Sequence, residues 1–576
     1  MQKHSPLAWF SLVLVALMCV LPFLVPHHRN PLTTFYGEWL AAALGLMAST
    51  LLLRRSSWQP FRFPVVALVP IGLMVVLGIQ VAAGLAVYWQ QHFLVGLYLF
   101  WAALLVVLGA ELRREFGLEK IVPVLAWAVL VGGLLSALIV ALQITGKNLM
   151  PYIVPAKAVG YGANLMQINH LANYLGLALA SLLYLVSTSR IKVGWAMLLA
   201  VALLFPLALT GQRMGWIYVV MLSVGGWLAG RKSGRWSWRI LLLIPAFMAL
   251  QYAIQLLAIS GAPVMPSQKV IAGMQGSSIR LQFIREAWDI FLAHPWLGAG
   301  WGQFGWQDFL LAEKYPEHAG WVSHPHNIVM QLMAETGLFG LSILIAGLYF
   351  LIRGCFSASI SNERWWLFAM LGVLGVHTLL EYPLWYAYFL GITAILLGLV
   401  EEKWLHIKLD LGHVMVGAVM GFGALSLGNL GTNYTQLEKW FAFYTSGRMS
   451  PALFDQMLNE ISVMRRKTLL APLVDLVIVR ALPNTPELLN DKLVVNRHVM
   501  LYQPREPETY NYATLLAMSN QPQAAQRQLQ LSLIRYDRYA DKYAMALLKE
   551  GRPETMPLVV TILRHNREIV AQEESK

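Results

Sequence analysis

Long apolar runs separated by short polar loops recur along the chain as far as residue 429. Each run has about the 20 residues that a helix needs to cross the hydrocarbon core of a bilayer. The pattern predicts about 13 transmembrane helices, which cover residues 7–25, 36–53, 64–83, 93–110, 121–143, 169–187, 194–210, 214–230, 240–258, 326–352, 365–381, 385–400 and 411–429.

Two stretches depart from this pattern. Residues 259–325 form a long segment between predicted helices, and residues 430–576 are polar and helix-rich. We therefore expect an all-α fold, a polytopic transmembrane helix bundle with a soluble helical domain at its C-terminal end. The expected parts are N-terminal transmembrane helices (1–258), a large periplasmic loop (259–325), C-terminal transmembrane helices (326–429) and a periplasmic helical domain (430–576).

The last part contains the stretch "ETYNYATLLAMSNQPQAAQRQLQLSLIRYD". Its spacing predicts a helix–turn–helix and carries a weak tetratricopeptide-like signal. Only one such unit is visible, so an ordinary helical hairpin fits equally well. The residues that carry the pattern are Tyr510, Ala513, Ala517, Ala524, Ala525, Leu529 and Leu533.

Composition and charge agree with a membrane protein. Of the 576 residues, 57% are hydrophobic and only 13% are charged, which is too little charge to cover a soluble surface. The formal net charge of +13 comes with basic residues gathered in the loops of one side. By the positive-inside rule that side is cytoplasmic, so the charge reflects membrane topology and not nucleic-acid binding. An odd number of helices then places residues 430–576 outside, in the periplasm of a Gram-negative cell.

The N-terminus and the cysteines add two exclusions. The first apolar run lacks a small-residue cleavage site and is followed by many more runs, so we expect an anchor and not a removed signal. The two cysteines, Cys19 and Cys355, cannot make a disulfide framework and lie in no metal-binding spacing.

The stretch "SHPHNIVMQLMAETGLFG", residues 323–340, places unusual polarity at the start of an apolar run. On a helix beginning at His326, the side chains of Asn327, Gln331 and Glu335 form one polar stripe. Glu335 would lie inside the bilayer, where ionisable groups are costly and usually face a bundle interior or a wet cavity. We expect Gly337 and Gly340 to admit a neighbouring helix. The alternative is that His326 only caps the helix at the membrane interface.

Further polar residues gather on the same outer side, at the ends of predicted helices or, for Arg280 and Arg285, in an amphipathic segment of the long loop. An arginine keeps its charge and suits a phosphate, and two arginines suit a diphosphate better. Singly, each arginine could instead extend from the membrane interface into water. The residues are Gln167, Asn169, His170, Arg213, Arg280, Arg285, His324, His377, Glu381 and Tyr382.

Several classes of protein lack support in the sequence. We find no acidic metal-binding pair in the first outer loop, no zinc signature, no P-loop and no dinucleotide fingerprint. We therefore expect no metal and no cofactor. What remains is a transporter, or a metal-free transferase that uses a lipid-linked substrate at the outer face.

The order of several stretches resembles the O-antigen ligase and polymerase superfamily. His326-Asn327, nine further residues, Gly337, two more residues and Gly340 match its histidine–glycine pattern. Within it the chain is most similar to bacterial protein O-oligosaccharyltransferases of the PglL type, which glycosylate pilins and other periplasmic proteins. The supporting stretches, which with the soluble tail cover nearly the whole chain, are "NPLTTFYGEWLA", "QINHLANYL", "HPWLGAGWGQF", "HPHN" and "LLEYPLWYAYFLG".

The resemblance implies a GT-C-like inner-membrane transferase whose active site faces the periplasm. Such an enzyme moves a whole glycan from undecaprenyl pyrophosphate to a Ser or Thr hydroxyl, without a metal. Its essential histidine maps to His326, its supporting glutamine to Gln167 and its functional tyrosine to Tyr382. Its pyrophosphate-binding arginines resemble Arg213 and Arg280, although "TGQR" at 210–213 replaces the serine that relatives often have before the arginine.

Other functions and mechanisms stay open at this point. An O-antigen ligase would use the same donor with a lipopolysaccharide core as acceptor, and a repeat-unit polymerase is a further relative. A polyprenyl-lipid flippase could also use a path lined with arginines. For a transferase we expect direct displacement with His326 as general base, while Glu381 keeps a covalent glycosyl-enzyme open.

Overall fold

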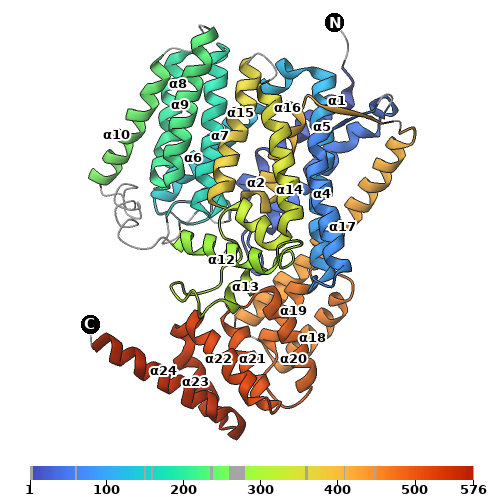
Figure 1. The fold of residues 1–576 in the computed structure, drawn as a ribbon. Helices are drawn as coiled ribbons and strands as arrows, with labels where there is room; N and C mark the ends of the chain where they lie inside the picture. The colour runs from blue at the N-terminus through green and yellow to red at the C-terminus, as the bar shows by residue number, and fades with distance from the viewer. Residues whose placement is uncertain are drawn as a thin grey trace. The chain divides into compact units, whose positions relative to one another are not determined.

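The computed structural model describes residues 4–58, 61–147, 149, 151–156, 160–233, 238–257, 279–356, 361–407, 409–446 and 449–574. Within these residues the regular structure is helical apart from one short sheet, which confirms the all-α class (Figure 1). In that sheet β1 (Phe61–Pro64) pairs antiparallel with β2 (Trp404–Ile407), so that Phe61 faces Ile407. The sequence analysis did not predict this sheet.

The helices up to the C-terminal part are α1 (Pro6–Met18), α2 (Leu21–Leu24), α3 (Phe35–Ala48), α4 (Leu68–Ala82), α5 (Trp89–Phe116), α6 (Leu118–Ile144), α7 (Ile168–Ser187), α8 (Val193–Leu209), α9 (Arg213–Ser233), α10 (Leu243–Leu256), α12 (Ile279–Ala293), α13 (Phe304–Leu310), α14 (Ile328–Phe356), α15 (Asn362–Leu380), α16 (Ala387–Val400) and α17 (Gly412–Thr445). The C-terminal helices are α18 (Pro451–Arg465), α19 (Ala471–Ala481), α20 (Leu489–Tyr502), α21 (Glu506–Met518), α22 (Pro522–Tyr536), α23 (Ala540–Glu550) and α24 (Met556–Glu574).

Every predicted apolar run falls on a helix. Nine helices among the described residues are long and apolar enough to cross a membrane: Pro6–Leu24, Phe35–Leu53, Val65–Ala82, Trp89–Phe116, Leu118–Ile144, Ile168–Ser187, Trp238–Leu256, Ile328–Arg353 and Gly412–Thr445. Two shorter apolar helices are Val193–Leu209 and Ala387–Val400. Helices α9 and α15 account for the remaining runs. The polytopic membrane architecture predicted from the sequence is thereby confirmed.

The contacts within the chain divide it into two compact units. Unit 1 comprises Met1–Met74, Leu97–Gly276 and Ile343–Gly428, and unit 2 comprises Val75–Gly96, Ser277–Ser342 and Asn429–Lys576. Both units are thus built from segments far apart in the sequence. The four consecutive parts expected from the sequence stay a prediction.

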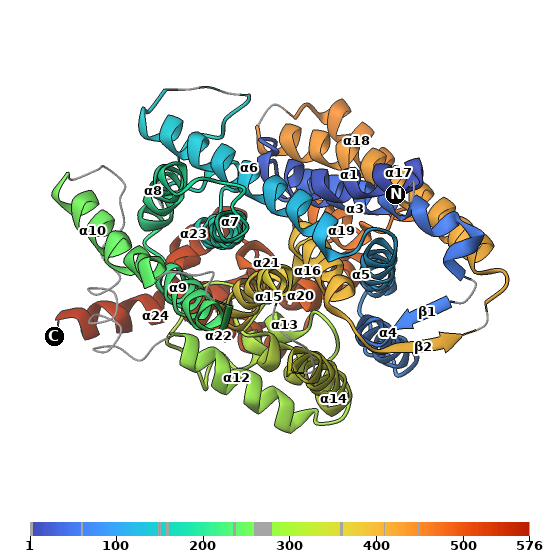
Figure 2. The same ribbon diagram turned by 90° about the horizontal axis from the view of Figure 1, so that it is seen from above.

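Helix α7 forms the centre of unit 1. It is buried from His170 to Leu185 and packs against α6, α8, α9 and α15 (Figure 2). Small residues permit the close approach of α6, since a β-carbon on Gly133 would lie 2.3 Å from that of Ala178. The centre of unit 1 therefore carries the polar residues at the start of α7.

Unit 2 contains the C-terminal helices, whose successive members pack against each other from α18 to α22, as α23 does against α24. Helices α21 and α22 form the predicted helix–turn–helix, and the predicted pattern residues are buried except for Ala524, which is exposed. Phe309 and Ala312 belong to the same hydrophobic core. The segment expected as a periplasmic loop thus contributes α13 to the core of the C-terminal helices.

Candidate active site

The predicted site residues are divided between the two units. Unit 1 holds Gln167, Asn169, His170, Arg213, His377, Glu381 and Tyr382. Unit 2 holds Arg280, Arg285, His324, His326, Asn327, Gln331 and Glu335.

In unit 1, Gln167 fixes the start of α7. Its backbone is extended, and its side-chain Oε1 accepts the main-chain N–H of His170 at 2.8 Å. This bond satisfies one of the amides that a helix leaves unpaired in its first turn. Ser, Thr, Asp and Asn are the usual residues at this position. A glutamine here is a longer cap that also carries an amide N–H₂ group.

The start of α7 and the end of α15 meet in one polar cluster. The Asn169 side-chain amide donates to Glu381 Oε1 at 2.9 Å, and Glu381 is the C-cap residue directly after α15. The rings of His170 and His377 lie edge to face with centroids 5.8 Å apart, and both residues are buried. The polar residues at the start of α7 and those at the end of α15 therefore lie side by side, although they are far apart in the sequence.

Three tyrosines after α15 extend this cluster. The rings of Tyr382 and Tyr386 stack at 6.0 Å, those of Tyr386 and Tyr388 stack at 5.6 Å, and the Tyr388 hydroxyl lies 3.2 Å from His170 Nδ1. Burial and the neighbouring charge of Glu381 raise the pKa of Tyr382, so its phenol stays protonated and can donate a hydrogen bond. The sequence analysis missed Tyr386 and Tyr388, although both lie in "LLEYPLWYAYFLG".

Arg213 is the first residue of α9 and is exposed. The first turn of a helix presents main-chain N–H groups and the positive end of the helix dipole, which together favour an anion. The guanidinium adds a permanent positive charge and a forked set of donors at the same helix end. This arrangement suits a phosphate group.

In unit 2, the structure corrects the predicted start of the helix that follows the two histidines. Helix α14 begins at Ile328, and His326 lies before it with a positive φ of 55°. Asn327 caps the helix, because its Oδ1 accepts the main-chain N–H groups of Val329 at 3.0 Å and Met330 at 3.2 Å. Asn and Asp are the strongest N-cap residues, which explains the later start. His326 is therefore a loop residue, and the predicted polar stripe on the helix is limited to Gln331 and Glu335.

The surroundings of His326 include the ring of Phe283 and the neighbouring His324. The ring of Phe283 is nearly parallel to that of His326, with centroids 6.0 Å apart. His324 Nδ1 lies 2.6 Å from the hydroxyl of Ser323. Burial and the neighbouring His326 lower the pKa of His324 to about 3, so His324 is neutral near pH 7.

Gln331 and Glu335 are buried in α14, with 2% and 1% of their surfaces exposed. Glu335 Oε1 accepts the main-chain N–H of Phe304 at 3.0 Å, and its carbonyl oxygen accepts the amide of Gln80 at 2.6 Å. Glu335 thus fastens the start of α13 to α14. A buried carboxylate that accepts a main-chain N–H supports local structure.

The predicted role of the glycine pair is also corrected. Gly337 interrupts α14 with φ 61° and ψ −153°. A β-carbon there would lie 2.4 Å from the carbonyl oxygen of Trp296, and the N–H of Leu338 donates to the carbonyl of Pro295 at 2.8 Å. What approaches at Gly337 is therefore a loop, and not a neighbouring helix. A β-carbon on Gly340 would meet the side chain of Thr336 in its own helix.

Arg280 and Arg285 are exposed on α12, an amphipathic helix. The opposite face of this helix is buried and contains Phe283, the residue whose ring stacks on His326. The same helix thus carries both arginines and the ring beside the candidate base.

Comparisons with known proteins place this architecture in a class. Residues 198–345 match the family model described as "O-Antigen ligase", and residues 365–547 match "Virulence factor membrane-bound polymerase, C-terminal". The first match contains Arg213 and His326, and the second contains Tyr382. The chain is a polytopic membrane protein, and these parts of it are similar to the O-antigen ligase and membrane-bound polymerase models, as the sequence resemblance predicted.

Two curated relatives from Acinetobacter baylyi extend the comparison. The chain is 26% identical over 402 residues to a "General O-oligosaccharyltransferase", covering 68% of this chain and 70% of the relative. It is 27% identical over 383 residues to a "ComP-specific O-oligosaccharyltransferase", covering 66% of this chain and 69% of that relative. Both relatives are named as enzymes that transfer glycans, so the chain is a glycosyltransferase.

Proposed function

We propose that the chain transfers an oligosaccharide en bloc from undecaprenyl pyrophosphate to Ser or Thr hydroxyls of periplasmic proteins such as a pilin. The observation that carries this proposal is the similarity, over about two thirds of the chain, to two relatives named as O-oligosaccharyltransferases. The soluble helical part in unit 2 gives further support by analogy of architecture, since a protein acceptor offers a surface to recognise.

The donor is bound through its pyrophosphate. Arg213, Arg280 and Arg285 are the proposed ligands, and all three are exposed at a helix start or on an amphipathic helix. Guanidinium groups bind phosphate oxygens in a forked geometry and keep their charge at every relevant pH. In the reaction they meet the negative charge that develops on the leaving pyrophosphate. The undecaprenyl chain stays in the membrane.

His326 is the proposed general base. It removes the proton of the acceptor hydroxyl while that oxygen forms a bond to the anomeric carbon and the bond from this carbon to the pyrophosphate oxygen breaks. The products are the O-linked glycan and undecaprenyl pyrophosphate. His326 lies in the loop before α14. This position supports the role, because the ring is not part of the packed helix. His324 and Asn327 position this loop, Gln331 lies buried in α14, and Glu335 fastens the start of α13 to α14.

The cluster in unit 1 is proposed to orient the reacting groups. Tyr382 donates through its protonated phenol, and Gln167 contributes its amide beside the start of α7. Asn169 and His170 support these two groups. Glu381 is held by the amide of Asn169, which favours direct displacement over a covalent intermediate formed on that carboxylate.

Transfer to a lipopolysaccharide core is the second candidate. It is favoured by the match of residues 198–345 to the model described as O-antigen ligase. The proposed location is the bacterial inner membrane, with the active site facing the periplasm, as the distribution of basic residues predicts.

The test compares acceptors directly. The purified full-length chain is supplied with an undecaprenyl-pyrophosphate-linked glycan and either a purified pilin or a lipopolysaccharide core. Intact-mass measurement of the pilin is expected to show addition of one whole glycan. Glycan on the lipid core alone would replace the proposal with the ligase function.

A further inference from the structure

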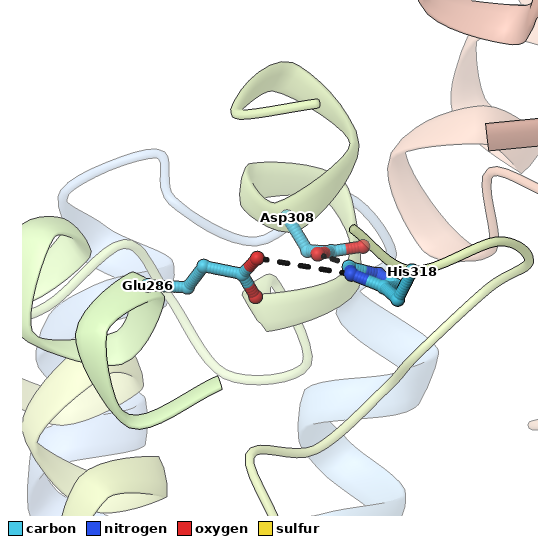
Figure 3. Close-up of side chains that lie close together, drawn as sticks. All are labelled: Glu286, Asp308 and His318. Carbon is cyan, nitrogen blue, oxygen red and sulfur yellow. Dashed lines mark ion pairs between the residues drawn. The ribbon is translucent and has the colours of Figure 1, made fainter. Parts of the chain in front are cut away.

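A buried charged cluster in unit 2 lies outside the site described above. Glu286, Asp308 and His318 are 0%, 2% and 5% exposed, and His318 Nε2 lies 3.2 Å from Asp308 Oδ1 (Figure 3). Their ligating atoms all lie within 4.8 Å of one another, a spacing that could hold a metal ion. The sequence analysis did not single out these residues.

Arg535 supplies the positive charge of this cluster. It comes from α22, is 1% exposed, and its Nη2 donates to Asp308 Oδ1 at 3.0 Å and to the Asp308 carbonyl at 2.9 Å. Its Nη1 donates to the carbonyls of Tyr315 at 2.7 Å and His318 at 3.1 Å. One side chain therefore satisfies a carboxylate and three carbonyl oxygens. The positively charged guanidinium of Arg535 therefore lies where a metal cation would otherwise balance the acidic residues.

The hydrogen bonds of His318 define its protonation. Its Nδ1 lies 2.9 Å from the side-chain amide nitrogen of Gln282 and 3.2 Å from Arg535 Nη1, and both of these are donors. Nδ1 must then be an acceptor, which leaves the ring neutral with its proton on Nε2, beside Asp308. Burial and the charge of Asp308 raise the pKa of Glu286 to about 8, so that carboxyl is also neutral near pH 7. Arg535 forms an ion pair with Asp308 at 3.0 Å, so the buried guanidinium has an acidic partner.

The cluster connects to His326 through α12. Gln282 contacts His318, and the next residue, Phe283, places its ring 5.0 Å from that of His318 and 6.0 Å from that of His326. The main chain adds a second tie, because the N–H of Gly320 donates to the carbonyl of Arg535 at 2.7 Å. Arg535 thus contacts His318 through its side chain and, through its main chain, Gly320 in the segment that leads to His326.

We propose that Arg535 is a positioning residue, which acts through Asp308, His318 and Phe283 to hold the loop that carries His326. Because Arg535 lies on α22, the C-terminal helices in this way determine the position of the His326 ring. The role in catalysis rests on the proposed function. A loop displaced by about 1 Å can cost roughly 10²-fold in rate, so the effect on transfer is expected to be large.

The first experiment uses Arg535→Lys with Arg527→Ala as matched control. Arg527 lies on the same helix and pairs with Glu313, but both side chains are about half exposed, so the pair contributes little. We expect Arg535→Lys to lower kcat by about 10–10²-fold with little change in donor KM, and Arg527→Ala to change kcat less than about 2-fold. Equal behaviour of the two variants would overturn the proposal.

A second variant tests whether Arg535 acts through the ring. Phe283→Leu leaves the charged cluster intact, and its own kcat is expected to fall, so an unchanged kcat would contradict the path even if Arg535→Lys fails to fold. If Arg535 acts through Phe283, the double variant loses less activity than the product of the two single losses. Independent, multiplicative losses would contradict the path. Loss of wild-type transfer on chelation, with recovery on adding a divalent metal, would instead make the cluster a metal site and overturn the proposal.

Hydrogen–deuterium exchange separates this proposal from the proposed function. In the full-length chain, Arg535→Lys is expected to increase exchange in residues 315–326, and Arg527→Ala is not. This result does not depend on activity. If the wild type transfers no glycan while the exchange result holds, the proposed function fails and the positioning role of Arg535 stands. Unchanged exchange would overturn the positioning role.

Discussion

Replacing Gly337 by alanine is expected to destabilise unit 2 strongly. Alanine would have to adopt φ 61° and ψ −153°, a conformation nearly restricted to glycine that costs about 1–3 kcal/mol. Its β-carbon would also lie 2.4 Å from the carbonyl oxygen of Trp296 and 2.7 Å from the amide nitrogen of Gly298. These are main-chain atoms that cannot rotate away, so moving their segment adds about 1–3 kcal/mol. The total is about 2–6 kcal/mol.

The assay is thermal unfolding of the full-length chain in detergent, followed together with glycan transfer. A loss of this size lowers Tm by about 5 °C or more for a unit of this length. The matched control is Gly78→Ala on α4, where an added β-carbon meets nothing within 4 Å. Alanine in a helix is favoured over glycine by up to about 1 kcal/mol, so this variant should be neutral or stabilised. Equal Tm values for the two variants would refute the reasoning about the break in α14.

Four further predictions concern single side chains. Arg213→Ala should raise donor KM and leave the folded protein in the membrane, and Arg213→Lys should recover only part of donor use because a point charge lacks the forked contact. Full activity of Arg213→Ala would remove this residue from the site. Tyr382→Phe should lower kcat without changing Tm, which kinetics and a melting curve check together. His324→Ala should retain more transfer activity than His326→Ala in the same membranes, since the lowered pKa of His324 makes its ring a weak base. Between about pH 4.5 and 8 folded Glu286 keeps a proton that the unfolded chain has lost, so stability should fall as pH rises, and Glu286→Gln should reduce this fall in Tm.

The membrane helices and the C-terminal hairpin could be predicted because both depend on local patterns. An apolar run of sufficient length is helical in a membrane whatever its neighbours are. The spacing of Tyr and small or apolar residues in α21 and α22 likewise identifies the buried face of each helix, apart from Ala524. Periodicity identifies the face of a helix that is covered, but not the residue that covers it.

The contacts between distant residues could not be predicted in this way. The bond between Asn169 and Glu381 joins positions 212 residues apart, and Arg535 meets Asp308 across 227. In the sequence, Arg535 has the charge and spacing of an exposed helix residue. Only the fold shows that its partners are buried with it.

Local backbone geometry was the second source of error. The pattern from His326 onwards has helical spacing, but Asn327 caps the helix and leaves His326 at φ 55°. Gly337 likewise fits a helix-packing motif, whereas its φ and ψ break the helix to admit a loop. Asparagine and glycine each serve in helices, caps and breaks, so residue type alone does not decide between them.

The most direct test of the central claim is glycan transfer by His326→Ala. Membranes carrying the wild type or this variant are supplied with an undecaprenyl-pyrophosphate-linked glycan and purified pilin, and donor binding is measured in parallel. If His326 is the general base, the variant should bind donor normally and transfer glycan at least about 10²-fold more slowly. Transfer at near the wild-type rate would contradict the account and leave His326 as a structural residue of the loop before α14.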